Sequence, residues 1–297
     1  MTDPLISVGI PFYNCQTCLL DSVRSIFAQT YANWELLLVD DGSDDDSVQL
    51  AQSIDDPRVR LLPPDGKNRK LAARLNQIAR NARGEYLARM DADDLCHPQR
   101  LETQLRFLLE HPEVDIVGGA SCILDPQGRP AKKFIVAQTH DQIFKRKFTG
   151  GISVVHPSLF AKTEWWRRWP YDENNYRSQD YELWLRTCND NVFANIPGIY
   201  YYTNEFVSYA LGKYARSKHR GAKIVWHYAR KEAGLLSAAY YAARRYQHIV
   251  MYALAIGLGF RNRLIARRYQ PLTEQERAEI TQILDQIRNT ELPLKNS

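Results

Sequence analysis

The sequence lacks any apolar run long enough to cross a bilayer, and it is poor in cysteine. Five cysteines among 297 residues are an odd number, and a chain of this length buries a sizeable core without cross-links. We therefore expect reduced thiols in a cytoplasmic protein. Cys15 and Cys18 have the spacing of a redox motif, but no second pair completes a zinc site, so we interpret them as incidental.

Glycine-rich phosphate-binding motifs and a secretory signal are also absent. Neither Gly-x-Gly-x-x-Gly nor a Walker sequence occurs, which argues against a dinucleotide cradle and against a P-loop. The N-terminus has no basic segment followed by an apolar core, so we expect no signal peptide.

Acidic residues are nearly missing from the C-terminal part of the chain. Between residues 211 and 270 there are thirteen Lys or Arg residues and one acid, Glu232. The formal charge of the whole chain is only +5, so the remaining residues are net acidic. This asymmetry predicts a catalytic body over residues 1–210 and a basic helical extension over residues 211–297 that meets an anionic surface.

Short apolar runs alternate with amphipathic segments over the first 120 residues. This alternation predicts an α/β fold with a mostly parallel, Rossmann-like sheet flanked by helices. The expected strands are residues 5–11, 34–39, 58–62, 85–90 and 114–120, and the expected helices are residues 19–29, 47–54, 71–82 and 99–109.

The alternation breaks after residue 121. Residues 152–160 and 196–203 are strand-like, and residues 178–188 have helical spacing. Asp125–Gly128 is typical of a turn between two strands. Thr273 and Glu276 form a capping-box pattern, which predicts a last helix through residue 287.

Three polar loops follow predicted strands, at residues 11–14, 40–43 and 91–94. Because the carboxyl ends of parallel strands share one edge of a sheet, all three loops should line the ligand-binding edge. Asp91 and Asp93 are two residues apart and can point the same way. Carboxylates with phosphate oxygens are usual ligands of Mg²⁺ or Mn²⁺. An isolated pair of this kind is more often a solvated turn, but the other two loops favour a metal–diphosphate site.

Several motifs in this order resemble those of the family-2 glycosyltransferases, which are inverting, nucleotide-sugar-dependent enzymes with the GT-A fold. The resemblance covers about two-thirds of the chain, with a nucleotide-sugar-binding half over residues 1–123 and an acceptor-binding half over residues 124–210. The matching pieces are SVGIPFYN (7–14), Ser25 with Gln29, WELLLVDDGSDD (34–45), GEYLARMDADD (84–94), Pro98 with Arg100-Leu101, VDIVGG (114–119), VVHPSLFAK (154–162) and QDYELWLR (179–186).

The resemblance implies roles for the nucleotide-binding loops. Pro11 and Tyr13 would line the nucleoside pocket, and Asp41 would bind the base, most simply a uracil N–H, with Asp40 nearby. Lys70 would present a cation to the base or phosphate. Other cations compete for that last role, namely Lys67, Arg69 and Arg74.

The resemblance also implies the catalytic groups. Asp91 and Ala92 would contact the nucleotide-sugar, and Asp93, helped by Asp91, would hold the metal. Asp180 would be the general base. Many members have Glu-Asp at this point, whereas this chain has Gln179 before Asp180, so an acid that would hold the acceptor is missing. Without the family context, an Asp at a helix start is more often only a cap.

His156, Gln179 and Trp184 are expected on the acceptor side. His156 could equally be a packed strand histidine. The cluster Trp165, Trp166 and Trp169 could stack on a sugar, although such clusters are more often core or interface. Glu182 and Arg186 are most simply an i,i+4 salt bridge.

The expected reaction is transfer of a sugar, most simply from a UDP-sugar, to a hydroxyl of a glycan or lipid-linked saccharide in envelope or exopolysaccharide assembly. A divalent metal would stabilise the leaving diphosphate, and one carboxylate would deprotonate the acceptor. A single displacement inverts the anomeric centre. Two alternatives are a sugar-1-phosphate nucleotidylyltransferase, which would need a glycine-rich basic loop that residues 14–17 do not provide, and a non-enzymatic membrane- or nucleic-acid-binding protein.

The apolar segment Tyr246–Phe260 is too short to span a membrane and has arginines on both sides. Basic flanks and tyrosines suit a helix lying on an anionic leaflet at the inner face of a membrane. Packing on the catalytic domain or in a dimer interface is an equal alternative. The acidic loops argue against nucleic acid as a partner.

Overall fold

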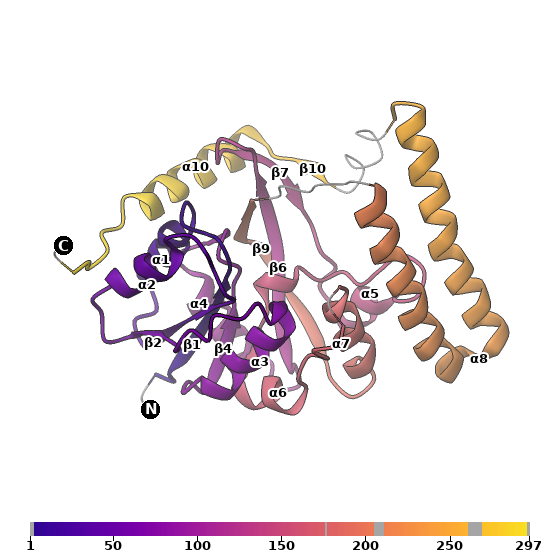
Figure 1. Cartoon of the computed structure of the whole chain (residues 1–297), viewed down its shortest axis with the longest axis horizontal. Coiled ribbons are helices and arrows are strands. Elements are labelled where there is room, and N and C mark those ends of the chain that lie inside the picture. The colour runs from indigo at the N-terminus through magenta and orange to yellow at the C-terminus, as the bar shows by residue number, and fades with distance from the viewer. Residues whose placement is uncertain (1–2, 176, 205–210, 261–268, 296–297) are drawn as a thin grey trace.

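The apolar runs of the N-terminal half form strands that are buried along their length, because helices cover both faces of the sheet (Figure 1). The computed structural model describes residues 3–175, 177–204, 211–260 and 269–295. Successive side chains of β2 (Trp34–Asp40) pack into two different hydrophobic cores, one on each face of the sheet. Leu36 and Leu38 pack in one core, whereas Leu37 and Val39 pack in the other.

Four parallel strands in the order β3-β2-β1-β4 make up the N-terminal part of the sheet. Gly9 in β1 is required by close packing, since a Cβ there would lie 2.3 Å from the Cγ2 of Ile78. The other elements of this part are β1 (Ile6–Phe12), β3 (Val59–Leu61), β4 (Tyr86–Arg89), α1 (Leu19–Phe27), α2 (Ser47–Ser53), α3 (Lys70–Asn81) and α4 (Arg100–Glu110).

The rest of the sheet is mixed, because β8 (Phe160–Lys162) enters between β4 and β6 (Ile116–Leu124) and runs antiparallel to both. The long strand β9 (Phe193–Asn204) is parallel to β6, and its end pairs with β5 (Leu95–Cys96). The predicted GT-A class, a sheet flanked by helices, is therefore confirmed, with parallel pairing interrupted at β8. The remaining elements are β7 (Pro130–Phe134), α5 (His140–Phe144), α6 (Thr163–Arg168) and α7 (Gln179–Thr187).

Two sequence predictions are wrong. Residues 152–160 do not form one strand, because His156–Ser158 is a 3₁₀ turn and pairing starts only at Phe160. Pro157 has no N–H to donate to a sheet, which favours the turn. Cys15 and Cys18 are not free thiols, since a turn after β1 brings their Cα atoms to 5.4 Å and the two sulfurs are bonded in a disulfide. The other three cysteines, Cys96, Cys122 and Cys188, are free and buried.

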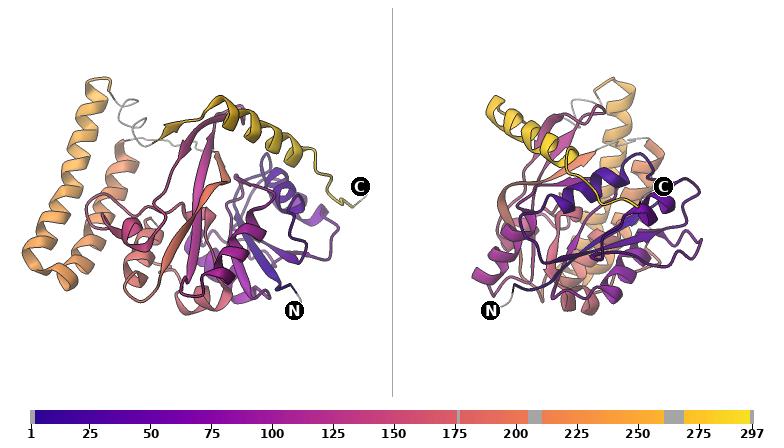
Figure 2. Two further views of the ribbon diagram at one scale, coloured as in Figure 1. Left: turned by 180° about the vertical axis from the view of Figure 1, so that it is seen from behind. Right: turned by 90° about the vertical axis from the view of Figure 1, so that its left-hand side faces the viewer.

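The C-terminal part contains a long helical segment, α8 (Leu211–Gly257), which breaks at Gly234 with φ of +82°. Its two helices run side by side as a hairpin at one end of the molecule (Figures 1 and 2). We call the segments 211–233 and 235–257 the first and second hairpin helices. The segment Tyr246–Phe260 therefore packs its Tyr252 and Ala255 inward and exposes other side chains. Its arginine flank at residues 261–268 lies outside the described residues, as does the expected boundary at residue 210.

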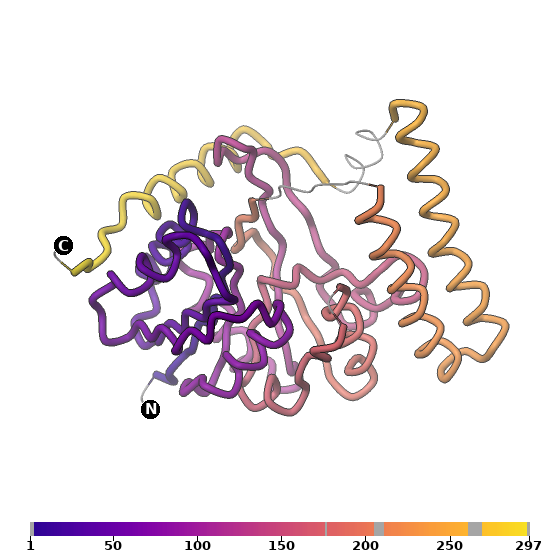
Figure 3. Tube along the Cα trace, viewed as in Figure 1, coloured from indigo at the N-terminus to yellow at the C-terminus, as the bar shows by residue number. Residues whose placement is uncertain are grey.

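After the hairpin, the chain returns to the catalytic body. β10 (Gln270–Pro271) pairs with β7, and α10 (Glu274–Arg288) packs against α1, so the C-terminal segment lies beside the N-terminal one (Figure 3). The predicted capping box between Thr273 and Glu276 is confirmed. The predicted extension thus consists of a hairpin and a returning segment. None of the described helices combines the length and apolarity that a membrane crossing requires.

Candidate active site

Three carboxylates cluster in the turn after β4. Oxygens of Asp91, Asp93 and Asp94 lie within 4.8 Å of one another. Asp93 is exposed, Asp91 is half-buried and Asp94 is buried. The end of β9 holds this turn, because the backbone N–H of Asn204 donates to the Asp94 carboxylate at 3.1 Å and its side chain donates to the Asp93 carbonyl. Ala92 is buried, and its carbonyl accepts a hydrogen bond from Ser22.

Burial and the nearby negative charges raise the pKa values of two of these aspartates. Burial first, then the charges of Asp91 and Asp93, raise the pKa of Asp94 well above its ordinary value. Burial and then Asp91 raise the pKa of Asp93. A divalent cation would relieve this repulsion, and clustered carboxylate oxygens are the hard donors that Mg²⁺ and Mn²⁺ prefer. The donor set therefore fits such a metal, with Asp94 as a third acid that sequence reasoning did not assign to it.

A buried arginine stands behind the cluster. Arg89 is 3% exposed, and its guanidinium donates to the two carboxylate oxygens of Asp91 at 2.7 and 3.3 Å. The backbone N–H of Asp91 donates to the hydroxyl of Tyr201 at 3.1 Å. Sequence reasoning missed both residues, although an arginine inside the otherwise apolar strand β4 is a signal that could have been followed.

Asp180 lies in the first turn of α7, which follows Ser178 in a left-handed conformation with φ of +69°. Its carboxyl is half-buried. Burial raises the pKa of Asp180, and a backbone hydrogen bond from Tyr181, followed by the positive charge of Arg89, opposes that rise. The same Arg89 that binds Asp91 therefore acts on Asp180, so the turn after β4 and the start of α7 face a common region.

His156 is half-buried, and Trp184 is buried. The His156 Nε2 and the Tyr171 hydroxyl are 2.7 Å apart, and the His156 ring centroid lies 5.6 Å from that of Trp184. Burial first, then Arg89, lower the pKa of His156 well below its ordinary value, so the imidazole is neutral near pH 7. Trp184 is buried and contacts the core strand residue Phe193. Gln179 is half-buried at the start of α7.

The two aspartates after β2 hold loops in place. Asp40 accepts hydrogen bonds from the backbone N–H groups of Gly42 and Ser43, both at 3.0 Å. Asp41 accepts from the backbone N–H groups of Arg69 at 2.7 Å and Lys70 at 3.1 Å. Most of these contacts, with that of Arg74, fall on one oxygen of Asp41, and its Oδ2 accepts only from Lys70.

Arg74 joins the loop after β2 to the loop before α3. It is 1% exposed and donates to Asp41 at 2.9 Å and to Asp65 at 2.7 Å. The signal for it is a charged residue on the apolar face of α3, between Leu71 and Leu75. Lys70 is exposed, with a left-handed φ of +72° at the start of α3.

The loop after β1 joins this arrangement. The backbone N–H of Asn14 donates to Ser43 Oγ at 3.0 Å, and its side chain donates to Asp44 at 2.6 Å. Pro11 is buried at the end of β1, whereas Tyr13 is 51% exposed beside it. The structure thus brings the three predicted loops to one edge of the sheet, as β1 and β2 end in register at Phe12 and Asp40.

Two of the interpretations that assigned a purely structural role are confirmed. Glu182 and Arg186 form the expected salt bridge at 3.0 Å. Trp165 and Trp166 are core residues, since their indole N–H groups donate to Asn191 and to the carbonyl of Leu87.

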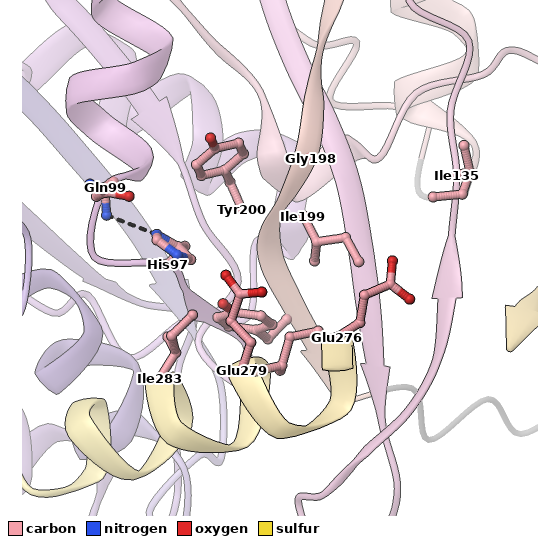
Figure 4. Close-up of a pocket in the computed structure, with 11 residues that line it drawn as sticks. His97, Gln99, Ile135, Gly198, Ile199, Tyr200, Glu276, Glu279 and Ile283 are labelled. Atoms are coloured by element: carbon pink, nitrogen blue, oxygen red, sulfur yellow. Dashed lines mark hydrogen bonds between the residues drawn. The ribbon is translucent and has the colours of Figure 1, made fainter. Parts of the chain in front are cut away.

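A pocket of about 420 Å³ lies on the other side of β9, between that strand and α10 (Figure 4). His97, Tyr200, Glu276 and Glu279 point into it. Tyr202 lines this pocket, whereas its neighbour Tyr201 contacts Asp91. Successive strand residues point to opposite faces, so this pocket is separate from the acidic cluster.

Comparisons with known proteins agree with this geometry. The family model described as "Glycosyl transferase family 2" matches residues 7–177. EpsE of Bacillus subtilis, which is named as a glycosyltransferase, is 33% identical over 188 residues, covering 62% of this chain and 66% of that protein. WfgD of Escherichia coli, a UDP-Glc:alpha-D-GlcNAc-diphosphoundecaprenol beta-1,3-glucosyltransferase, is 30% identical over 198 residues, covering 66% and 74%. The chain thus spans about two thirds to three quarters of the length of these relatives.

Solved structures share the fold. S. aureus TarS 1–349 in complex with UDP-GlcNAc has a TM-score of 0.60 at 17% identity, over 79% of this chain and 72% of that one. The mannosyltransferase PcManGT from Pyrobaculum calidifontis, in complex with GDP-Man and Mn²⁺, has a TM-score of 0.57 at 17% identity, over 97% and 86%. The family model covers more than half of the sequence, including all three loops. The chain therefore belongs to glycosyl transferase family 2.

Proposed function

We propose that this protein transfers a sugar from a UDP-sugar to a hydroxyl of a glycan or lipid-linked saccharide, with inversion, during envelope or exopolysaccharide synthesis. One observation carries the proposal. Arg89 donates to Asp91 of the acidic cluster, and its positive charge also opposes the rise in the pKa of the candidate base Asp180. A diphosphate bound by the acidic cluster would then lie beside an acceptor hydroxyl at Asp180.

On the donor side, the three loops would bind the nucleotide-sugar. Asp93, with Asp91 and Asp94, would hold Mg²⁺ or Mn²⁺, which supplies charge stabilisation for the departing diphosphate. Tyr13 would cover the nucleoside beside Pro11. Asp41 would accept a base N–H through its Oδ2, Asp40 would shape the loop beside it, and the exposed Lys70 would approach the base or a phosphate.

On the acceptor side, Asp180 would remove the proton of the attacking hydroxyl. Its raised pKa makes its ionised form a stronger base than an exposed carboxylate. The neutral His156 and Gln179 would orient the acceptor by hydrogen bonds, and Trp184 would support His156 from the core.

The acceptor and location are proposed from the relatives. WfgD, as its name states, acts on a diphosphoundecaprenol-linked saccharide, and TarS has been solved with UDP-GlcNAc. A similar lipid-linked acceptor here would require a cytoplasmic enzyme working at the inner face of the membrane.

Nucleotide binding tests the donor site. We expect UDP with MnCl₂ to raise the melting temperature of the wild type more than UDP with EDTA, because binding to the folded state adds stability. Asp93→Asn should lose the Mn²⁺-dependent part. Asp190→Asn, at an exposed position beyond α7, should keep it. Stabilisation by GDP in place of UDP would reassign the donor base.

Turnover tests the base. Asp180→Asn should keep the nucleotide-dependent shift and reduce transfer from a UDP-sugar by about 10²–10⁴-fold, the usual size of general-base catalysis. Full transfer by this variant would rule out Asp180 as the base. Loss of both nucleotide binding and transfer would indicate a structural role instead.

A further inference from the structure

The second hairpin helix carries an exposed apolar surface in two stretches, at residues 236–240 and 250–258, with the polar Gln247 between them. Its members are between 51% and 86% exposed, although all are large and apolar. We call this surface the stripe, and it consists of Leu236, Tyr240, Val250, Met251, Leu254 and Leu258.

The stripe occupies a single face of the helix. Positions 236, 240, 250, 254 and 258 fall within a narrow arc at about 100° per residue. The residues buried on this helix, Ala238, Arg245, Tyr252 and Ala255, fall on the opposite arc. From Leu236 to Leu258 the stripe is about 33 Å long at a helical rise of about 1.5 Å per residue. Exposed apolar surfaces of this extent mark interaction sites.

Charge on the hairpin selects the partner. Residues 211–260 contain nine Lys or Arg residues and one acid, Glu232, which is bound to Lys147 at 2.6 Å. Five of the cations on the first hairpin helix are exposed, namely Lys213, Arg216, Lys223, Arg230 and Lys231. Two such hairpins placed stripe to stripe would repel each other, whereas an anionic lipid surface would attract both the cations and the apolar side chains.

The structure shows that one arginine beside the apolar segment does not face solvent and so cannot contact lipid headgroups. Arg245, in the basic flank of the apolar segment, is buried and donates to the Tyr181 hydroxyl, with its guanidinium over the Tyr181 ring at 4.8 Å. It fastens the hairpin to α7 and does not face solvent. The stripe also begins ten residues before Tyr246, at Leu236, next to the turn at Gly234.

The hairpin stands beside the acceptor half. Tyr228 on its first helix donates to Glu182 of α7 at 2.6 Å, two residues from Asp180. A surface pocket of about 520 Å³ joins that helix, through Arg220, Lys223 and His227, to α7 and to residues 172–175. A bilayer bound by the hairpin would therefore lie near the side of the protein that receives the acceptor.

We propose that the stripe inserts into the surface of an anionic bilayer, with the cations of the first hairpin helix held by its headgroups. The link to a lipid-linked acceptor rests on the proposed function, but the docking itself does not.

Vesicle co-sedimentation of the full chain tests the docking. We expect binding to vesicles of 70% phosphatidylcholine and 30% phosphatidylglycerol, weakened by high salt, and little binding to pure phosphatidylcholine. The double variant Leu236→Gln/Leu254→Gln should bind at least about tenfold more weakly, because burying even one leucine shifts an equilibrium by about that factor. Both side chains are exposed, so the fold should be unaffected.

Leu109→Gln is the matched control, since Leu109 is 60% exposed on α4, against 59% for Leu254. It should bind vesicles like the wild type. Equal loss in the control and in the double variant, or no binding of the wild type to anionic vesicles, would overturn the proposal. So would a dimer in sedimentation equilibrium that the double variant abolishes, because the stripe would then join two copies of the chain.

The UDP and Mn²⁺ thermal shift separates the two proposals. The double variant should keep the wild-type shift, as the stripe is remote from the acidic cluster. Vesicle binding without any nucleotide-dependent shift in the wild type would leave the docking in place and count against the proposed function alone.

Discussion

At the scale of single residues, the site is defined by charges that burial makes unfavourable. Arg89 has a buried Nε with no hydrogen-bond partner within the described part of the chain, and its remaining donors are directed at Asp91 and at the acidic region. Burial raises the pKa of Asp180 and lowers that of His156. These directions are those of a general base and a neutral hydrogen-bonding imidazole, respectively.

The raised pKa of Asp180 predicts how stability depends on pH. A carboxyl whose pKa is higher in the folded state stabilises the fold below its unfolded value, about 3.9, and that stability is lost as the pH rises through the folded pKa. Asn cannot ionise. We therefore expect the melting temperature of Asp180→Asn, relative to wild type in EDTA, to increase as the pH rises through this window.

Calorimetry between pH 4 and pH 8 measures this difference. Asp190→Asn, which replaces an exposed carboxyl, should show a nearly constant difference from wild type. A constant difference for Asp180→Asn as well would mean that Asp180 has an ordinary pKa. The rate of transfer should rise over the same window in the wild type, because only the ionised base is active.

At the scale of elements, a helix and two loops depend on one ion-pair network around the buried Arg74. Arg74 on α3 joins Asp41 after β2 to Asp65 in the loop before α3. Gly42 permits the contact, since its φ is +80° and a Cβ there would lie 2.8 Å from the Lys67 carbonyl carbon. The loops after β2 and before α3, which we propose bind the nucleotide and call the nucleotide loops, are thus built by tertiary contacts that bridge from 28 to 33 residues of sequence.

Replacing Arg74 should therefore loosen the nucleotide loops. We expect Arg74→Met to lower the free energy of unfolding by about 2 kcal/mol, because the buried Asp41 loses a charge-assisted hydrogen bond. Affinity for UDP should fall with it. Arg69→Met removes an exposed partner of the same Asp65 and should cost about 0–1 kcal/mol. Urea denaturation measures the free energy of unfolding of both variants. Equal decreases would contradict the proposed role of Arg74 in joining the two loops.

At the scale of the whole molecule, the hairpin is attached more weakly than the sheet. It contacts the body mainly through a small apolar cluster that contains Val225, Ala229 and Ala238, and through the polar contacts of Tyr228 and Arg245. Strands β1, β2 and β6, in contrast, are buried along their whole length. Weakly attached units open at lower free energies than the core.

Hydrogen exchange should therefore be faster in the hairpin than in the sheet. We expect backbone amides of residues 211–257 to exchange faster than those of β1, β2 and β6, with the first hairpin helix slower than the second. Mass spectrometry of peptides resolves these segments. Protection of the hairpin equal to that of β1 would show that the two open together as one cooperative unit.

Much of this protein followed from local sequence patterns. The alternation of apolar runs predicted β1, β2 and β4 and the helices between them, because a strand covered on both faces must be apolar throughout. The positions of Asp91, Asp93 and Asp180 also followed from motif order, and the capping box at Thr273 from its spacing.

Only the tertiary structure decided the rest. The insertion of β8 between β4 and β6, the bond between Cys15 and Cys18, and the meeting of Arg89 with Asp91 and Asp180 depend on how distant segments pack. The same is true of the stripe, since residues 235–257 are apolar on two sides and the sequence cannot say which side is covered. A local pattern fixes which side chains share a face, but the partner of that face is set by burial, which is a property of the whole chain.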